Sequence, residues 1–168
     1  MTDPHPMTAA FRDAFRCHPA GVALLTADNN GTPVALTVSS LISVSSNPPI
    51  VAFSLSLASS AAQPLLDAET IVIHMLGFDD LHLAQLGSTS GADRFGPGVD
   101  WMRLPTGEPR YSRVGTWFRA RIIGTLPVQG AAVVSAELLE GEVSAKTTGQ
   151  ALVYHDRKWH RLQSETAT

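Results

Sequence analysis

The sequence is poor in cysteine and in charge. Cys17 is the only cysteine in the 168 residues, so neither an intrachain disulfide nor a multi-cysteine metal site can form. Charged residues make up 16% of the chain, against about 25% in a typical domain, and hydrophobic residues make up 44%. This balance excludes intrinsic disorder, which requires high charge and few apolar side chains. A single cysteine is typical of a reducing compartment, and we therefore expect a cytoplasmic protein.

The chain also lacks an excess of basic residues. Its formal net charge is -3 at pH 7, whereas a nucleic-acid-binding protein usually presents a basic face, so we expect no nucleic-acid partner. Residues 1–6 contain neither a basic nor an apolar segment, so we expect no signal peptide. The 38 residues from Asn29 to Leu66 carry no charged side chain, but Pro33, Pro48, Pro49 and many serines interrupt them. We therefore expect no membrane span.

Most of the remaining pattern is that of strands. Apolar or alternating runs predict strands at residues 21–26, 34–38, 41–45, 50–56, 70–76, 117–126 and 131–143, and a closing hairpin at 152–162. Short helices are predicted at residues 8–16 (capped by Thr8), 61–67 and 79–86. Asn30-Gly31 predicts a hairpin turn, because both residues tolerate positive φ. Residues 87–115 show no period and are predicted to form a long connection.

These elements predict a mainly β fold. We expect one domain over residues 1–168, with its core at about 10–162. Seven or more strands with only two or three short helices are typical of a β-barrel with helical additions.

Serine is unevenly distributed along the chain. Nine of the 15 serines lie within the 22 residues from 39 to 60. One group lies between two predicted strands and a second lies around the end of the next strand and the start of a helix: Ser39 and Ser40, then Ser54, Ser56, Ser59 and Ser60. Hydroxyl and backbone N–H groups at such places bind anions, so this region suits a phosphorylated cofactor. The alternative is that these serines only form caps and turns and face solvent.

A series of short motifs follows one another along the chain. They are Gly21-Val22, Asn30-Gly31-Thr32, Thr37-Val38-Ser39-Ser40, Ser43-Val44-Ser45, Pro48-Pro49, Thr70–Leu76, Asp93-Arg94-Phe95 and Leu152-Val153-Tyr154. In this order they resemble the flavin reductase-like family, whose members share the flavin-binding split-barrel fold. The resemblance covers roughly residues 10–162.

The resemblance implies a split β-barrel that binds FMN, or FAD, and takes hydride from NADH or NADPH. The implied cofactor-binding residues are Thr37, Val38, Ser39 and Ser40 for the ring and ribityl chain, Ser54, Leu55 and Ser56 through backbone groups, Ser59 and Ser60 near the phosphate, and Arg94 and Phe95 from the long connection. Flavin itself accepts hydride, so we assign no catalytic acid or base. The resemblance further implies a homodimer with flavin near the interface, and a monooxygenase partner that receives reduced flavin.

One segment departs from the family pattern. Many active reductases carry Gly-Asp-His before the last long strand, whereas this chain has Gly130-Ala131-Ala132. If the missing pair orients nicotinamide, the protein binds flavin but reduces it slowly, and Ala131→Asp with Ala132→His should raise the rate. The alternative is that His74 or His155 already fills the role. Two further possibilities stay open: a flavin-binding protein without efficient reductase activity, and a flavin-free split-barrel interaction module.

Other reactive side chains form no recognisable motif. His74 and His82 lack metal-ligand spacing, so we expect two surface histidines and no metal site. Cys17 lies between Arg16 and His18, and we expect an unreactive, half-buried thiol. The three tryptophans are expected in the core or an interface: Trp101, Trp117 and Trp159.

Overall fold

The computed structural model describes residues 5–144 and 150–162. The helices are α1 (Thr8–Arg16), α2 (Ala62–Asp67) and α3 (Leu81–Ser88), with the short 3-10 helix η1 (Phe78–Asp80) before α3. The strands are β1 (Ala20–Gly21), β2 (Ala23–Asn29), β3 (Thr32–Val38), β4 (Ile42–Ser46), β5 (Pro49–Ser56), β6 (Thr70–Met75), β7 (Trp101–Arg103), β8 (Pro109–Tyr111), β9 (Trp117–Val128), β10 (Ala131–Glu142), β11 (Leu152–His155) and β12 (Lys158–Arg161). Within these described ranges, no helix is long and apolar enough to cross a membrane.

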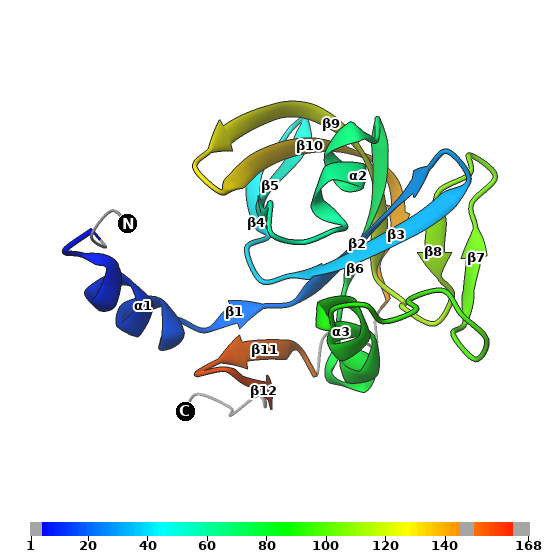
Figure 1. Cartoon of the computed structure of the whole chain (residues 1–168). Coiled ribbons are helices and arrows are strands. Elements are labelled where there is room, and N and C mark those ends of the chain that lie inside the picture. The colour runs from blue at the N-terminus through cyan, green and yellow to red at the C-terminus, as the bar shows by residue number, and fades with distance from the viewer. Residues whose placement is uncertain (1–4, 145–149, 163–168) are drawn as a thin grey trace.

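Seven strands form one antiparallel sheet that curls around the core (Figure 1). Their order is β3-β2-β6-β9-β10-β5-β4, so the consecutive strands β3 and β4 form the two edges of the sheet. Two smaller sheets, β1-β11-β12 and β7-β8, lie outside it. The prediction of a mainly β barrel with two or three short helices is confirmed.

The turn between β2 and β3 follows from its two residues. Asn30 has φ 50° and Gly31 has φ 89°, and Asn29 pairs directly with Thr32 across the hairpin. Asparagine and glycine adopt this left-handed conformation most readily, and they match the twist of the strands. The backbone N–H of Gly31 also donates to Asp28 Oδ2 at 2.7 Å. The predicted hairpin is therefore confirmed.

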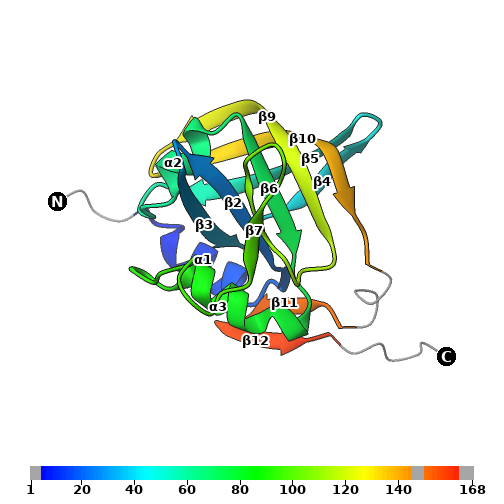
Figure 2. The ribbon, with the colours of Figure 1, turned by 90° about the vertical axis from the view of Figure 1, so that its right-hand side faces the viewer.

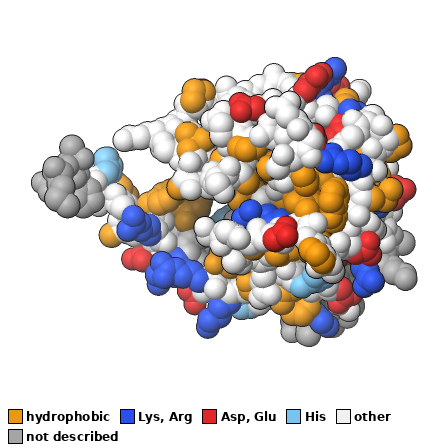
Figure 3. All heavy atoms as spheres, turned by 45° about the vertical axis from the view of Figure 1, so that its right-hand side comes forward, with side chains coloured by type: hydrophobic (Ala, Val, Ile, Leu, Met, Phe, Trp, Pro, Cys, Tyr) orange, Lys and Arg blue, Asp and Glu red, His pale blue; other side chains and the backbone are white. Residues whose placement is uncertain are grey.

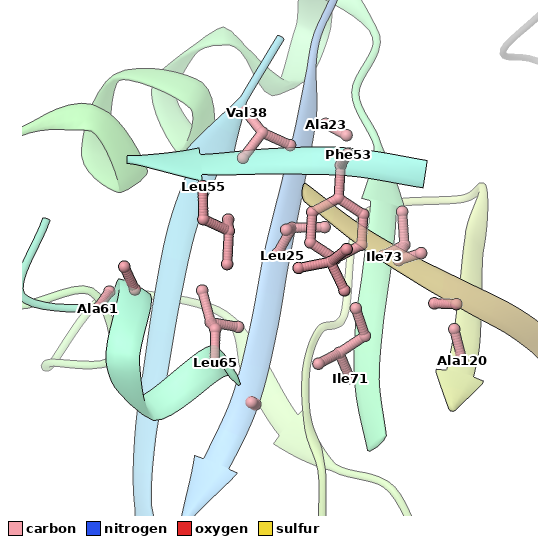
Figure 4. Packing of buried hydrophobic residues seen from close by; sticks show 14 residues of the cluster. Ala23, Leu25, Val38, Phe53, Leu55, Ala61, Leu65, Ile71, Ile73 and Ala120 are labelled. Atoms are coloured by element: carbon pink, nitrogen blue, oxygen red, sulfur yellow. The ribbon is translucent and has the colours of Figure 1, made fainter. Parts of the chain in front are cut away.

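The main core lies inside the curled sheet (Figure 4). Leu25 from β2, Phe53 from β5 and Ile73 from β6 point toward one another there, and each is at most 3% exposed. Leu65 from α2 packs against the same cluster, so this helix covers one end of the barrel. Buried and exposed residues alternate toward the end of β5, and β6 is buried on both faces. Both patterns fit the apolar or alternating runs in the sequence.

Strand β2 is buried on both faces, because a second layer covers its outer side. Leu24 is fully buried there, against Leu83 of α3, Tyr111 of β8 and Leu152 of β11. Figure 2 shows the β7-β8 hairpin crossing the outer face of β2 and β6, with α3 beside it. Gly87 permits the close approach of α3, since a Cβ there would lie 2.3 Å from both Leu24 Cδ1 and Thr37 Oγ1.

Three local predictions are wrong. Residues 87–115 contain the β7-β8 hairpin, whose three-residue strands are too short to show a period. Thr8 does not cap α1: it is the first helical residue, and no side-chain cap hydrogen bond is present. Cys17 is exposed rather than half-buried.

His74 is a buried residue, which corrects the surface prediction. Its ring is 0% exposed, with Nδ1 2.9 Å from the Leu24 carbonyl oxygen. Its Nε2 accepts a hydrogen bond from the Tyr111 backbone N–H at 3.0 Å, so the ring proton must lie on Nδ1. Burial lowers the pKa of His74 from 6.5 to about 4; the Arg110 guanidinium acts in the same direction and the Leu24 hydrogen bond opposes it. The ring is therefore neutral at physiological pH.

The depressed pKa of His74 makes stability depend on pH. The free energy of unfolding should fall as the pH drops from 6.5 toward about 4, because the unfolded chain takes up a proton that the folded ring does not accept. The limiting slope from one such group is about 1.4 kcal/mol per pH unit. Urea unfolding at a series of pH values measures it, and His74→Gln, which cannot titrate, should lack this part of the slope. Equal slopes in the two proteins would contradict the prediction.

Candidate functional site

A hollow of about 820 Å³ lies between α1 and the barrel. We call it the α1 cleft. Three predicted serines lie on its barrel side: Ser39, Ser40 and Ser54. Aromatic and basic side chains from α1 and the β11-β12 hairpin complete it: Phe11, Phe15, Tyr154, Arg12, Arg16 and Arg157. Figure 3 shows α1 standing away from the body, with hydrophobic and basic side chains beside the hollow.

The serines of the α1 cleft have two different roles. Ser40 Oγ accepts a hydrogen bond from the Ser54 backbone N–H at 2.9 Å and donates to the Ser54 carbonyl oxygen at 3.1 Å. This pair of bonds fixes the loop between β3 and β4 against β5. Ser39 and Ser54 are exposed, so their hydroxyl groups face the cleft side of the molecule without being buried.

The α1 cleft is positively charged. Arg12, Arg16 and Arg157 are all exposed, and Asp156 reaches Arg16 only at 4.0 Å. Arginine side chains bind phosphate groups through paired N–H donors. Aromatic rings beside them, such as Phe11 and Phe15 with centroids 4.5 Å apart, suit a planar ligand that also carries phosphate.

A second, smaller hollow of about 310 Å³ contains three more of the predicted residues: Ser60, Arg94 and Phe95. We call it the Arg94 pocket. It is lined by Thr32, Pro33, Val34, Ala35, Ser60, Ala61, Ala92, Asp93, Arg94 and Phe95. Ser60 is exposed, so its hydroxyl group is available to a ligand.

The guanidinium of Arg94 is incompletely paired. Its Nη2 donates to the Thr89 carbonyl oxygen at 2.9 Å, but its buried Nε has no hydrogen-bond partner among the described residues. The Arg94 side chain lines the pocket, so an anion there would lie beside its positive charge. The Arg94 pocket therefore suits a phosphate group.

Strand β3 connects the two hollows. Val34 lines the Arg94 pocket and Ser39, just past the end of the strand, lines the α1 cleft. Five residues of extended chain separate them by roughly 16 Å, which is comparable with the length of an extended flavin mononucleotide. Strand β3 is an edge strand, so no other described strand pairs with its outer side.

The remaining predicted residues support the site rather than face it. Thr37 Oγ1 donates to the Ala84 carbonyl oxygen of α3 at 2.8 Å. Val38 and Leu55 point into the core, at 7% and 1% exposure, so only their backbones can contact a ligand. Ser56 Oγ accepts from the Ala58 N–H at 3.4 Å and Ser59 Oγ from the Ala61 N–H at 3.3 Å. These last two serines shape the loop before α2.

Sequence reasoning missed the contribution of α1. Its aromatic pair Phe11 and Phe15 and its basic pair Arg12 and Arg16 each have the four-residue spacing of neighbours on a helix. No residue of this helix is buried. An aromatic pair and a basic pair on a helix with no buried residue indicate that the helix contacts a ligand or a partner.

The segment Gly130-Ala131-Ala132 leaves little space for the histidine of the Asp-His pair. Gly130, with φ 75°, lies in the turn between β9 and β10. Ala132 is 2% exposed and pairs with Leu55, so a histidine there would be forced into the packed interior. His74 cannot replace the pair either, because its ring is fully buried.

Comparison with known proteins agrees with these features. Residues 15–163 match the family model described as "Flavin reductase like domain". An NADH:FMN oxidoreductase from Rhodococcus qingshengii is 36% identical over 153 residues, which is 90% of this chain and 80% of that protein. The reductase component of a 4-nitrophenol 4-monooxygenase/4-nitrocatechol 2-monooxygenase from Rhodococcus opacus is 25% identical, with 95% and 89% covered. The crystal structure of a flavin reductase domain protein from Arthrobacter sp. FB24 superposes with a TM-score of 0.88 at 32% identity, covering 95% of this chain and 98% of that one.

Proposed function

The chain belongs to the flavin reductase-like family, and from that premise we propose that it is an NADH-dependent FMN reductase. The observation that carries the proposal is the arrangement of two hollows along one edge strand. One is aromatic and basic, and the other offers a hydroxyl group and a guanidinium group. A planar ring system with a phosphate at the end of a flexible chain has the matching chemistry.

In this proposal the Arg94 pocket holds the phosphate of FMN. Arg94 supplies the positive charge of its guanidinium and Ser60 its hydroxyl group. No lysine or arginine occurs between Asn29 and Leu66, so Arg94 is the cation that the long connection brings to this pocket. FMN, which has one terminal phosphate, suits the small pocket better than FAD does.

The α1 cleft then holds the flavin ring and the nicotinamide nucleotide. Bound flavin supplies the hydride acceptor, and the protein orients it and excludes water. Ser39, Ser54 and the open edge of β3 lie where they can bond to polar atoms of the ring and ribityl chain. Arg12, Arg16 and Arg157 suit the phosphates of NADH or NADPH.

The biological setting follows from the same family relationship. A relative from Rhodococcus opacus is the reductase component of a monooxygenase, and we propose that this chain likewise passes reduced flavin to a separate oxygenase. We also propose that it acts in the cytoplasm, where nicotinamide nucleotides are available and the exposed thiol of Cys17 stays reduced.

We further propose that the protein is a homodimer. Helix α1 has nine residues, none of them buried, and a helix this short is marginal in water without packing. Phe11 and Phe15 are 57% and 61% exposed, and Ile42 and Val44 on β4 are 60% and 58% exposed. A second copy related by a two-fold axis would cover these surfaces and close the α1 cleft from outside.

Spectroscopy and kinetics test the function directly. Purified protein mixed with FMN should show the shifted visible bands of bound flavin and should then consume NADH. If the missing Asp-His pair orients nicotinamide, the rate should lie well below the roughly 10 per second of a typical enzyme. Flavin binding without NADH consumption would instead support a flavin-binding protein of another role. Neither binding nor consumption would support an interaction module.

Ser60→Asp tests the phosphate position. The added carboxylate should repel the phosphate and weaken FMN binding by more than tenfold, or about 1.4 kcal/mol, measured by fluorescence titration. Riboflavin, which has no phosphate, should bind as before. Ser46→Asp makes the same change of charge at an exposed position on β4 and should leave both affinities unchanged. Unchanged FMN affinity in Ser60→Asp would remove Ser60 from the site.

Light scattering tests the dimer. The protein should have a mass of about 36 kDa, twice the 17.9 kDa of one chain. Phe11→Glu combined with Phe15→Glu should shift it to the monomer, because charges replace the apolar face of α1. Asp13→Lys, on the same helix, should stay dimeric. A wild-type mass of one chain at micromolar concentration would refute the proposal.

A further inference from the structure

The β7-β8 hairpin carries no ladder bond to the main sheet, so side chains hold it in place. Two groups of β8 bond to side chains of the barrel. The Pro109 carbonyl oxygen accepts from Thr26 Oγ1 of β2, and the Tyr111 N–H donates to His74 Nε2 of β6. The Tyr111 N–H is buried and donates to His74 Nε2, although Tyr111 lies opposite Trp101 in the β7-β8 pair. An orphaned buried N–H is costly, which makes His74 the group that fixes the position of Tyr111.

Tyr111 in turn fixes the backbone of Arg94. Its hydroxyl group donates to the Arg94 carbonyl oxygen at 2.8 Å. Burial raises the pKa of Tyr111, so the hydroxyl group keeps its proton and remains a donor. The Tyr111 ring also stacks on Phe95, with centroids 5.5 Å apart and an interplanar angle of 12°.

A second bond holds the same backbone from the other strand of the hairpin. Trp101 Nε1 donates to the Phe95 carbonyl oxygen at 2.9 Å. Two consecutive carbonyl groups, those of Arg94 and Phe95, are thus held by side chains of β8 and β7. The position of the Arg94 guanidinium in its pocket depends on where this hairpin sits on the barrel.

We propose that His74 is a positioning residue for phosphate binding, acting through Tyr111 on the backbone that carries Arg94. The inference rests on the proposed function, because it requires that the Arg94 pocket bind the phosphate of FMN. His74 does not touch the ligand. It supplies an acceptor that joins β8 to β6, and Tyr111 of β8 in turn holds the backbone of Arg94.

Two substitutions at position 74 distinguish the hydrogen bond made by Nδ1 of the imidazole from the one made by Nε2. In His74→Asn the side-chain amide can still donate to the Leu24 carbonyl oxygen, but it is too short to reach Tyr111. In His74→Gln the longer side chain can again accept from the Tyr111 N–H. Tyr111→Phe leaves that N–H bond intact and removes only the bond to the Arg94 carbonyl oxygen.

The readout is the ratio of the FMN and riboflavin dissociation constants for each variant. Partial unfolding changes both constants by the same factor, so the ratio reports only the phosphate. We expect the preference for FMN to fall about fivefold in His74→Asn and in Tyr111→Phe, the effect of one lost hydrogen bond, and to return in His74→Gln. In an Arg94→Ala background, His74→Asn should cause no further change, because both act on one interaction.

The possible results are distinct. Wild-type protein that binds riboflavin as tightly as FMN would overturn the phosphate pocket itself, and the inference with it. A wild-type preference for FMN that His74→Asn and Tyr111→Phe leave unchanged would overturn the inference alone. A fall of the same size in the Arg94→Ala background would also overturn it, because the effect would then bypass Arg94.

Discussion

The structure depends on the burial of strand β2 on both faces. Its inner face packs into the barrel through Leu25, and its outer face carries Leu24, which is fully buried as well. Apolar side chains on an outer face must be covered to remove them from water. Helix α3, the β7-β8 hairpin and β11 cover this one, and they form the second layer, which holds the backbone of Arg94 and contributes Tyr154 to the α1 cleft.

The second layer is attached to the barrel by side chains rather than by extension of the sheet. Glu108 illustrates this: its carboxylate is 4% exposed and bonds to Thr70, Thr106 and Arg119, whose Nε lies 2.7 Å away. Burial raises the pKa of Glu108, but hydrogen bonds from Thr106, Thr70, its own backbone N–H and Arg119 together hold it below its usual range. Such contacts fix the hairpin in one position, which a site on a long connection requires.

Local pattern predicted the strands of the barrel, because their alternation and their turn residues are local properties. The hairpin at Asn30-Gly31 and the long strand pair at 117–142 are examples. The β7-β8 strands were missed because three residues show no period. The burial of His74 was missed because Tyr111, whose ring lies against it, is 37 residues away in sequence. The serines were placed near the two hollows, but only the fold shows which hydroxyl groups are already bonded, as in Thr37, and which are exposed, as in Ser60.

The two free edges of the curled sheet bear on aggregation. An exposed edge strand is a template on which another chain can add a strand. Pro33 interrupts the row of N–H donors along β3, and a register shift between Ser43 and Ser45 breaks the regular geometry of β4. Neither edge can therefore support a continuous intermolecular ladder. The protein can leave the edge of β3 open to a small ligand while resisting the strand addition that leads to fibrous association.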